Sequence, residues 1–291
     1  MARHTYFKVG GPAEALVSPL NIEDLTQLVR WCTIQGHKTL VIGGGSNLLV
    51  KDGGIAGVVI SLRQCLTGIK VVVSGKKPMV TAQAGVNLQA LCRFCAEQGL
   101  SGLNFAVGIP GTVGGAIMMN AGTAIGTMAD VIDSIGCLHW DGRMARYKGR
   151  ELNFSYRSLT IQEMRVGVDS QAPIIIDGYF QLKTGDSSML QQEAKVLMKT
   201  RLEKQPVHLP SAGCFFKNPV DGPSAGELID RCELKGVRIG NAQVSNKHAN
   251  YIVNLGGASA RDILSLMELV KSKVADQFKV DLETEVKIVG V

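Results

Sequence analysis

The most informative stretch of this 291-residue chain reads Gly108-Ile109-Pro110-Gly111-Thr112-Val113-Gly114-Gly115-Ala116 and continues as Ile117-Met118-Met119-Asn120-Ala121-Gly122. It mixes five glycines with small and apolar residues and contains no charged side chain. Its backbone N–H groups are therefore its main hydrogen-bond donors, and glycine lets the backbone approach a flat or anionic ligand closely. The stretch predicts a backbone cradle for such a ligand.

A second glycine-rich stretch, Gly43-Gly44-Gly45-Ser46-Asn47, follows the apolar run at residues 39–42. Two such cradles in one chain indicate a large cofactor that carries a diphosphate. Either stretch alone is also compatible with a tight turn between buried strands, because glycine-rich motifs give false positives. Neither reads Gly-x-Gly-x-x-Gly at a strand-to-helix turn, so a dinucleotide would bind on a fold other than the usual one.

Composition and charge narrow the class of protein. Apolar residues make up 45% of the chain and charged residues 19%, which allows a sizeable core in about two domains. The net charge of +6 comes from dispersed basic residues without interleaved aromatic ones, which favours anionic small molecules over nucleic acid. Apolar runs stay well short of the ~18 residues of a membrane span, and the first residues lack the apolar core of a signal peptide. Seven irregularly spaced cysteines suit a reducing cytoplasm.

Helical and strand patterns alternate along the chain. Three residue pairs have the spacing of a capping box and predict helix N-termini: Asn21 with Asp24, Ser224 with Glu227, and Ser259 with Asp262. Further helices are expected at residues 88–99 and 187–204. Strands are expected at residues 39–42, 58–62, 71–73, 79–84, 135–140, 174–182, 251–255 and 285–289. This mixture predicts an α+β protein.

The same reading predicts three parts. They are residues 1–62, 63–205 and 206–280, and the terminal strand within residues 281–291 returns to the first part. The boundary near residue 205 follows from the two prolines in Gln205-Pro206-Val207-His208-Leu209-Pro210.

Two side chains in the C-terminal third could carry chemistry. Cys214 lies between a small-residue turn and an aromatic pair, with Lys217 three residues later. A nearby cation favours the thiolate, and a thiol can also donate a proton. The alternative is a buried structural cysteine. His248, in a polar cluster before a predicted strand, could contact an anion or simply order its loop.

Other candidates have simple structural explanations when they are taken singly. Arg157 follows a tyrosine and reads as a surface residue. Glu283 and Glu285 would share one face of the closing strand, where solvation is the ordinary outcome. Cys92 and Cys95 have the spacing of metal ligands, but no second pair accompanies them, so we expect two buried structural cysteines.

Over nearly its whole length the chain resembles the UDP-N-acetylenolpyruvoylglucosamine reductases of bacterial cell-wall synthesis. The resemblance rests on both glycine-rich stretches and on residues 5–13, Tyr156-Arg157, residues 211–219, residues 244–250 and Glu285-Val286. The two glycine-rich stretches alone would indicate only the wider flavin-binding fold of the vanillyl-alcohol-oxidase type. The chain is too short for the insertion that carries a substrate-gating tyrosine in one subgroup, so it resembles the shorter subgroup.

This resemblance implies the FAD-binding fold of the vanillyl-alcohol-oxidase type, an α+β architecture. Residues 1–62 and 63–205 would form two flavin-binding subdomains, and residues 206–280 a substrate-binding domain. It implies non-covalent FAD, NADPH as the hydride donor, and reduction of UDP-N-acetylglucosamine enolpyruvate to UDP-N-acetylmuramate. Arg157 and Glu285 match the family's two polarising residues. Cys214 stands where the family has the Ser or Cys that protonates C2.

The remaining site residues follow from the same motifs. FAD contacts are expected from Gly43, Gly44, Gly45, Ser46, Asn47, Gly108, Ile109, Pro110, Gly111, Gly114, Gly115, Ala116 and Gly122. Substrate contacts are expected from Lys217, Asn218, His248 and Asn250. We expect no metal ion, a cytoplasmic monomer, and neither a nucleic-acid nor a membrane partner. The competing interpretations are a non-catalytic diphosphate-binding module and a flavin oxidase of the same fold.

Overall fold

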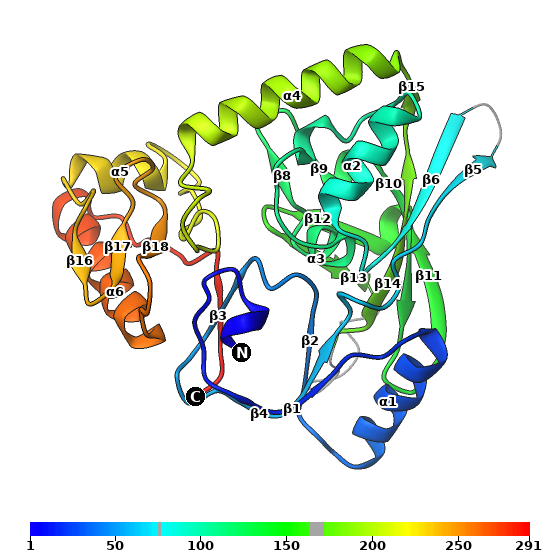
Figure 1. The fold of residues 1–291 in the computed structure, drawn as a ribbon, viewed down its shortest axis with the longest axis horizontal. Coiled ribbons are helices and arrows are strands. Elements are labelled where there is room, and N and C mark those ends of the chain that lie inside the picture. Colours follow the sequence, from blue (N-terminus) through cyan, green and yellow to red (C-terminus); the bar gives the residue numbers. More distant parts are fainter. Residues whose placement is uncertain (75–76, 163–171) are drawn as a thin grey trace. The chain divides into compact units, whose positions relative to one another are not determined.

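A computed structural model describes residues 1–74, 77–162 and 172–291. The chain folds into two compact units (Figure 1). The larger unit comprises Leu16–Gly44 and Gly57–Lys199, and the smaller unit comprises Met1–Ala15, Gly45–Ala56 and Thr200–Val291. Each unit therefore combines segments that are far apart in the sequence. The division into three parts expected above stays a prediction.

The larger unit contains a five-stranded antiparallel sheet in the order β11-β10-β14-β6-β5 (Figure 1). Its strands are β5 (Ile69–Ser74), β6 (Lys77–Gln83), β10 (Ile132–Leu138), β11 (Met144–Lys148) and β14 (Ile174–Gln181). Helix α3 (Val113–Met118) packs against β14 and β6, and α2 (Leu88–Glu97) packs against α3. Phe180, Ile117 and Leu88 are fully buried in the resulting core.

Helix α1 (Ile22–Ile34) of the larger unit begins as predicted. The Asn21 side chain accepts a hydrogen bond from the N–H of Asp24 at 2.8 Å. The chain leaves the helix through Gly36, whose φ of +67° is open to glycine at little cost. The following strand, β2 (Thr39–Ile42), pairs in parallel with β4 (Ile55–Ser61). The first glycine-rich stretch follows directly after the end of β2.

The smaller unit packs α5 (Ala225–Arg231) and α6 (Ala260–Phe278) with a three-stranded antiparallel sheet. The sheet has the order β16 (Arg238–Ile239), β17 (Ala242–Val244), β18 (Ile252–Asn254). Ser259 and Asp262 form the predicted capping box at α6. The last strand, β19 (Lys287–Val289), pairs in parallel with β3 (Leu48–Val50), so the end of the chain lies beside a segment near its beginning.

The remaining elements are shorter, apart from one long helix. That helix, α4 (Ser187–Lys204), has the predicted bounds. The other strands are β1 (Ala13–Val17), β7 (Leu100–Ser101), β8 (Gly122–Thr123), β9 (Gly126–Thr127), β12 (Leu152–Ser155), β13 (Ser158–Ile161) and β15 (Lys183–Thr184). Short 3-10 helices span Ala2–His4, Asn104–Ala106, Met128–Asp130 and Gly149–Glu151.

Some local expectations were wrong and others are confirmed. The glycine-rich stretch at residues 108–122 contains the short helix α3, which the sequence did not predict. Strand β19 begins at Lys287, so Glu283 and Glu285 lie before the strand and not in it. Cys92 and Cys95 are buried, as expected, at 8% and 1% exposure.

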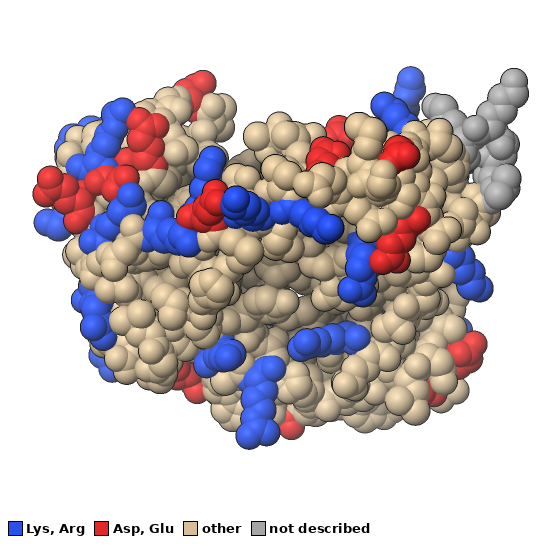
Figure 2. Space-filling view, turned by 45° about the horizontal axis from the view of Figure 1, so that its top comes forward, with Lys and Arg blue, Asp and Glu red and all other residues tan. Residues whose placement is uncertain are grey.

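On the face shown in Figure 2, Lys and Arg side chains lie among Asp and Glu side chains. Within the described residues, no helix combines the length and the apolar character that crossing a membrane requires. All seven cysteines are free thiols.

Candidate active site

The two glycine-rich stretches meet in the larger unit. A Cβ atom on Gly43 would lie 2.1 Å from the Oγ1 atom of Thr112, and one on Gly44 would lie 2.9 Å from the Cα atom of Gly111. Because Cβ atoms do not approach other atoms so closely, glycine is required where these two backbones touch. The fold thus joins two distant motifs into one backbone surface, which we call the glycine cradle (Gly43, Gly44, Gly111 and Thr112).

Backbone hydrogen bonds decide which N–H groups of the cradle can serve a ligand. Among the residues of the longer stretch that are predicted to contact FAD, the N–H groups of Gly108, Ile109, Gly114 and Ala116 already donate to acceptors inside the larger unit, at distances of 2.6 to 3.0 Å. Within the described part of the chain, no acceptor is found for the N–H groups of Gly43, Gly44, Gly111 and Thr112. The donation expected from the whole stretch is therefore reduced, while the cradle keeps these four N–H groups for a ligand.

Gly114 has a packing role that the sequence did not indicate. A Cβ atom at this position would lie 2.8 Å from the Cβ atom of Ala84, and the N–H of Gly114 donates to the oxygen of Ala84 at 2.9 Å. Glycine here lets α3 approach the end of β6 closely.

Thr112 adds a side chain to the cradle that sequence reasoning missed. The residue is 4% exposed, and its Oγ1 atom has no hydrogen-bond partner among the residues described. Leaving a buried hydroxyl unpaired costs about 1–3 kcal/mol. The position therefore fits a polar ligand that pairs with the hydroxyl, and together with the free N–H groups it fits an anionic cofactor. Only its place inside the glycine-rich stretch could have drawn attention to Thr112.

The rest of the first glycine-rich stretch belongs to the smaller unit. A Cβ atom on Gly45, where φ is +67°, would lie 2.0 Å from the backbone oxygen of His4. The Nδ2 atom of Asn47 donates to the backbone oxygen of Glu285 at 3.1 Å, and the N–H of Lys287 donates to the oxygen of Asn47 at 3.0 Å. Asn47 thus connects the predicted cofactor loop to the segment that carries Glu285.

Arg157 lies in the two-residue turn of the hairpin formed by β12 and β13 in the larger unit. Its φ of +57° is a left-handed conformation that costs a non-glycine residue roughly 1–2 kcal/mol. The Nη1 atom donates to the backbone oxygen of Gly122 at 3.2 Å, and the guanidinium carbon lies 5.2 Å from the ring centre of Tyr156. The turn is held by Asn120, whose Nδ2 atom donates to the oxygen of Ser155 at 3.0 Å. A strained, half-buried arginine at a fixed position suits recognition of a carboxylate.

Cys214 lies where three segments of the smaller unit converge. The N–H of Phe215 donates to the oxygen of Asn250 at 2.8 Å, and the N–H of Glu285 donates to the oxygen of Phe215 at 2.8 Å. Gly213, with φ of +80°, turns the chain just before the half-buried Cys214. The structure therefore brings together two residues that the sequence predicts to be catalytic, Cys214 and Glu285.

Asn250 holds this arrangement through its side chain. The residue is 3% exposed; its Nδ2 atom donates to the oxygen of Phe216 at 2.8 Å, and its Oδ1 atom accepts from the N–H of Phe216 at 2.9 Å. Both halves of the amide are engaged with one backbone residue. This engagement favours a role in positioning the Cys214 loop over the substrate contact predicted from the sequence.

The two residues that follow the aromatic pair have partners of their own. The Nζ atom of Lys217 lies 3.1 Å from the Oε2 atom of Glu283, and its N–H donates to the oxygen of Glu283 at 2.8 Å. The Oδ1 atom of Asn218 accepts from the N–H of Ala225, the first residue of α5, at 3.1 Å. The charge of Lys217 is thus shared with a carboxylate.

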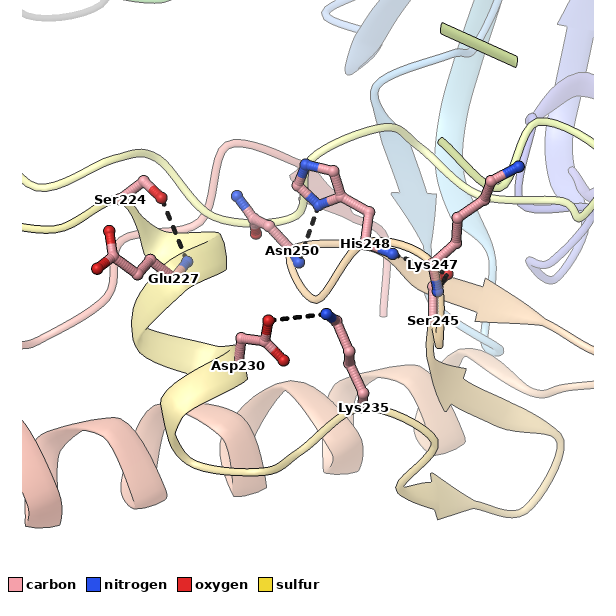
Figure 3. Close-up of polar contacts among 8 residues, drawn as sticks. All are labelled: Ser224, Glu227, Asp230, Lys235, Ser245, Lys247, His248 and Asn250. Carbon is pink, nitrogen blue, oxygen red and sulfur yellow. Dashed lines mark hydrogen bonds and ion pairs between the residues drawn. The ribbon is translucent and has the colours of Figure 1, made fainter. Parts of the chain in front are cut away.

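His248 lies above the first turn of α5 (Figure 3), where its Cε1 atom is 3.3 Å from the Cβ position of Gly226. Its Nδ1 atom accepts from the N–H of Asn250 at 3.2 Å. Burial lowers the pKa of His248, and the charge of Lys235 lowers it further, although Lys235 is paired with Asp230 at 2.7 Å. A neutral ring that accepts at Nδ1 carries its proton on Nε2, so His248 presents a single donor.

Tyr251 is a second residue that sequence reasoning missed, since it read as the start of a strand. Its hydroxyl hydrogen-bonds with the thiol of Cys214. A buried tyrosine usually finds a partner for its hydroxyl, but the sequence does not say which one.

The cradle and the fold around it define a class of protein. Residues 13–148 match the family model of the FAD binding domain, which confirms the expected α+β flavoprotein fold. FAD is therefore the cofactor that the glycine cradle and Thr112 fit.

Further comparisons identify the family. Residues 205–289 match the C-terminal domain of UDP-N-acetylenolpyruvoylglucosamine reductase. The reductase of Desulfosudis oleivorans is 46% identical over 291 residues, which cover 100% of this chain and 93% of the relative. That of Heliobacterium modesticaldum is 39% identical, with coverage of 100% and 89%. The crystal structure of the reductase from Thermus caldophilus matches with a TM-score of 0.80 at 35% identity, covering 99% of this chain and 97% of that one. The chain belongs to the UDP-N-acetylenolpyruvoylglucosamine reductase family.

Proposed function

We propose that this chain reduces UDP-N-acetylglucosamine enolpyruvate to UDP-N-acetylmuramate, with NADPH as the electron source, in the synthesis of peptidoglycan precursors. The observation that carries the proposal is the 46% identity to a reductase of that name across the full length of the chain. When bound, FAD would supply the redox chemistry that links NADPH to C3 of the enol ether. The chain itself supplies position, charge and a proton.

Arg157 and Glu285 are proposed to stabilise charge on the substrate. Hydride addition at C3 leaves negative charge on C2 and on the neighbouring carboxylate. The planar guanidinium of Arg157 suits that carboxylate, and its restrained position in the hairpin turn reduces the entropy lost on binding. Glu285 can donate a hydrogen bond to the same group if its carboxyl is protonated.

Cys214 is proposed to give its proton to C2. In this step the S–H bond breaks, a C2–H bond forms with the electron pair on C2, and a thiolate remains. Its position after the turn at Gly213 brings the thiol to a half-exposed surface. Lys217, Asn218 and His248 are proposed to contact the substrate. Asn250 is proposed to hold the Cys214 loop in position through its two hydrogen bonds to the Phe216 backbone.

The wider setting is also part of the proposal. We propose a cytoplasmic monomer whose partners are NADPH and the nucleotide-sugar substrate, with no nucleic-acid or membrane partner. Residues 1–62 and 63–205 are proposed as the flavin-binding subdomains, with the terminal strand added to the first, and residues 206–280 as the substrate-binding domain.

Two measurements on the purified protein test this function. Acid should release a yellow flavin from the protein, which a covalent flavin oxidase or a flavin-free binding module would not allow. NADPH oxidation should then depend on UDP-N-acetylglucosamine enolpyruvate and yield a product heavier by two hydrogen atoms. A yellow protein that leaves this substrate unchanged in the presence of NADPH would contradict the proposal.

A further inference from the structure

Tyr251 and Cys214 are brought side by side by the backbone of the smaller unit. The N–H of Phe215 donates to the oxygen of Asn250. Cys214, which precedes Phe215, therefore lies next to Tyr251, which follows Asn250. The Asn250 side chain adds two hydrogen bonds to Phe216 and fixes the register of the two segments. The hydroxyl of Tyr251 meets the thiol of Cys214 as a consequence.

The surroundings of Tyr251 keep its hydroxyl protonated. The residue is 8% exposed, and its ring packs edge-on against His248 with 4.9 Å between ring centres. Burial raises the pKa of Tyr251, and the neighbouring Cys214 and Glu285 raise it further, while Arg201 of α4 opposes them. A hydroxyl that does not ionise acts toward a negatively charged sulfur only as a hydrogen-bond donor.

We propose that Tyr251 is a positioning residue that orients the thiol of Cys214 and stabilises the thiolate left after proton donation. This inference rests on the proposed role of Cys214 as the proton donor to C2. Before the next turnover the thiolate takes a proton from solvent water, and Tyr251 keeps its own proton throughout.

The physical reason lies in the change of charge on sulfur. A neutral thiol is a weak acceptor, whereas a thiolate is a strong one, so the hydrogen bond from Tyr251 strengthens as the proton leaves. A donor that interacts more strongly after the transfer makes the thiol a stronger acid. Lys217 contributes less to this effect because Glu283 shares its charge.

The test compares Tyr251→Phe with the parent holoenzyme, both in a Cys232→Ser background. Cys232 is the other partly exposed cysteine, and the remaining five are buried, so iodoacetamide should modify chiefly Cys214, as peptide mass spectrometry can verify. The rate of modification is measured against pH. Loss of the hydroxyl should move the profile to higher pH and slow modification below its midpoint about tenfold, the loss expected from one hydrogen bond to a charged group.

Tyr147→Phe is the matched control. Tyr147 is also buried, at 3% exposure, and its hydroxyl lies 2.7 Å from the Nε2 atom of His139 in the larger unit. Its loss removes a buried hydrogen bond of the same kind but should leave the pH profile of Cys214 unchanged. Flavin content and melting temperature are recorded for every variant. Both should stay near the parent values, because phenylalanine keeps the ring packing at both positions.

Flavin reoxidation by the enolpyruvyl substrate is the second measurement. Tyr251→Phe should slow this half-reaction at neutral pH and leave flavin reduction by NADPH unchanged. An unchanged alkylation profile, or a shifted profile with reoxidation at the parent rate, would overturn the inference. Failure of the proposed function is seen separately, because the parent itself would then not be reoxidised by the enolpyruvyl substrate. Failure of the proposed role of Cys214 is seen when Cys214→Ala reoxidises like the parent.

Discussion

Gly43 and Thr112 lie so close together that a single added methyl group would not fit between them: a Cβ atom on Gly43 would be 2.1 Å from the Thr112 Oγ1 atom. That buried oxygen has no hydrogen-bond partner among the described residues. Glycine at position 43 thus leaves room for the buried Thr112 hydroxyl inside the cradle, where the cofactor is expected.

Substitution in the glycine cradle should remove the cofactor. In Gly43→Ala and Gly44→Val the new side chains would collide with Thr112 and Gly111, so we expect most of the protein to be purified without flavin. The measurement is the ratio of flavin to protein absorbance, together with the melting temperature. Gly185→Ala is the control, since its Cβ atom would meet nothing closer than 3.4 Å. Full flavin content in both cradle variants would show that FAD binds elsewhere.

Arg157→Ala and Glu285→Ala should separate the two halves of the reaction. Both residues are assigned to charge that develops on the enolpyruvyl substrate, and loss of one such group commonly costs ~10²–10³ in rate. Stopped-flow absorbance should therefore show flavin reduction by NADPH at nearly the parent rate and slow reoxidation by substrate. Glu285→Gln should recover part of the loss, because an amide can still donate a hydrogen bond. Equal slowing of both half-reactions would refute these roles.

Cys214→Ala should lose most turnover, whereas Cys214→Ser should remain active. General acid catalysis contributes typically ~10²–10⁴-fold, and a hydroxyl can replace a thiol as the proton source if its surroundings assist. The rate of flavin reoxidation is measured for each variant after its flavin content. Cys232→Ser serves as the control, because Cys232 is the other partly exposed cysteine and has no proposed role in the reaction. If Cys214→Ala turns over at the parent rate, the proton reaches C2 from another group.

The neutral state of His248 should make stability fall in mild acid. Burial lowers the pKa of this residue in the folded chain below its value near 6.5 when unfolded. The unfolded state therefore binds a proton that the folded state resists as pH falls below about 6.5, so folding is progressively disfavoured there. Melting temperatures at pH 7 and pH 5 should differ less in His248→Gln than in the parent. His208→Gln, at an exposed position, should behave like the parent; a parent-like loss in His248→Gln would contradict the assignment.

Local structure was largely predictable because its causes are local. Asn21 and Ser259 cap their helices through N–H groups three residues away, and α4 has the predicted bounds. The closing strand was placed two residues too early because alternation over so few residues does not define where pairing begins. The hairpin of β12 and β13 was missed for the same reason.

The sequence by itself determined the local elements, the two glycine-rich motifs and, through resemblance, the family. Which residues of those motifs face each other was decided only by the tertiary structure. Gly43 meets Thr112, Asn250 binds the Phe216 backbone, and Tyr251 reaches Cys214 because packing brings distant segments together. Such contacts depend on the whole core, whereas a capping pair or an apolar period depends only on residues a few positions apart.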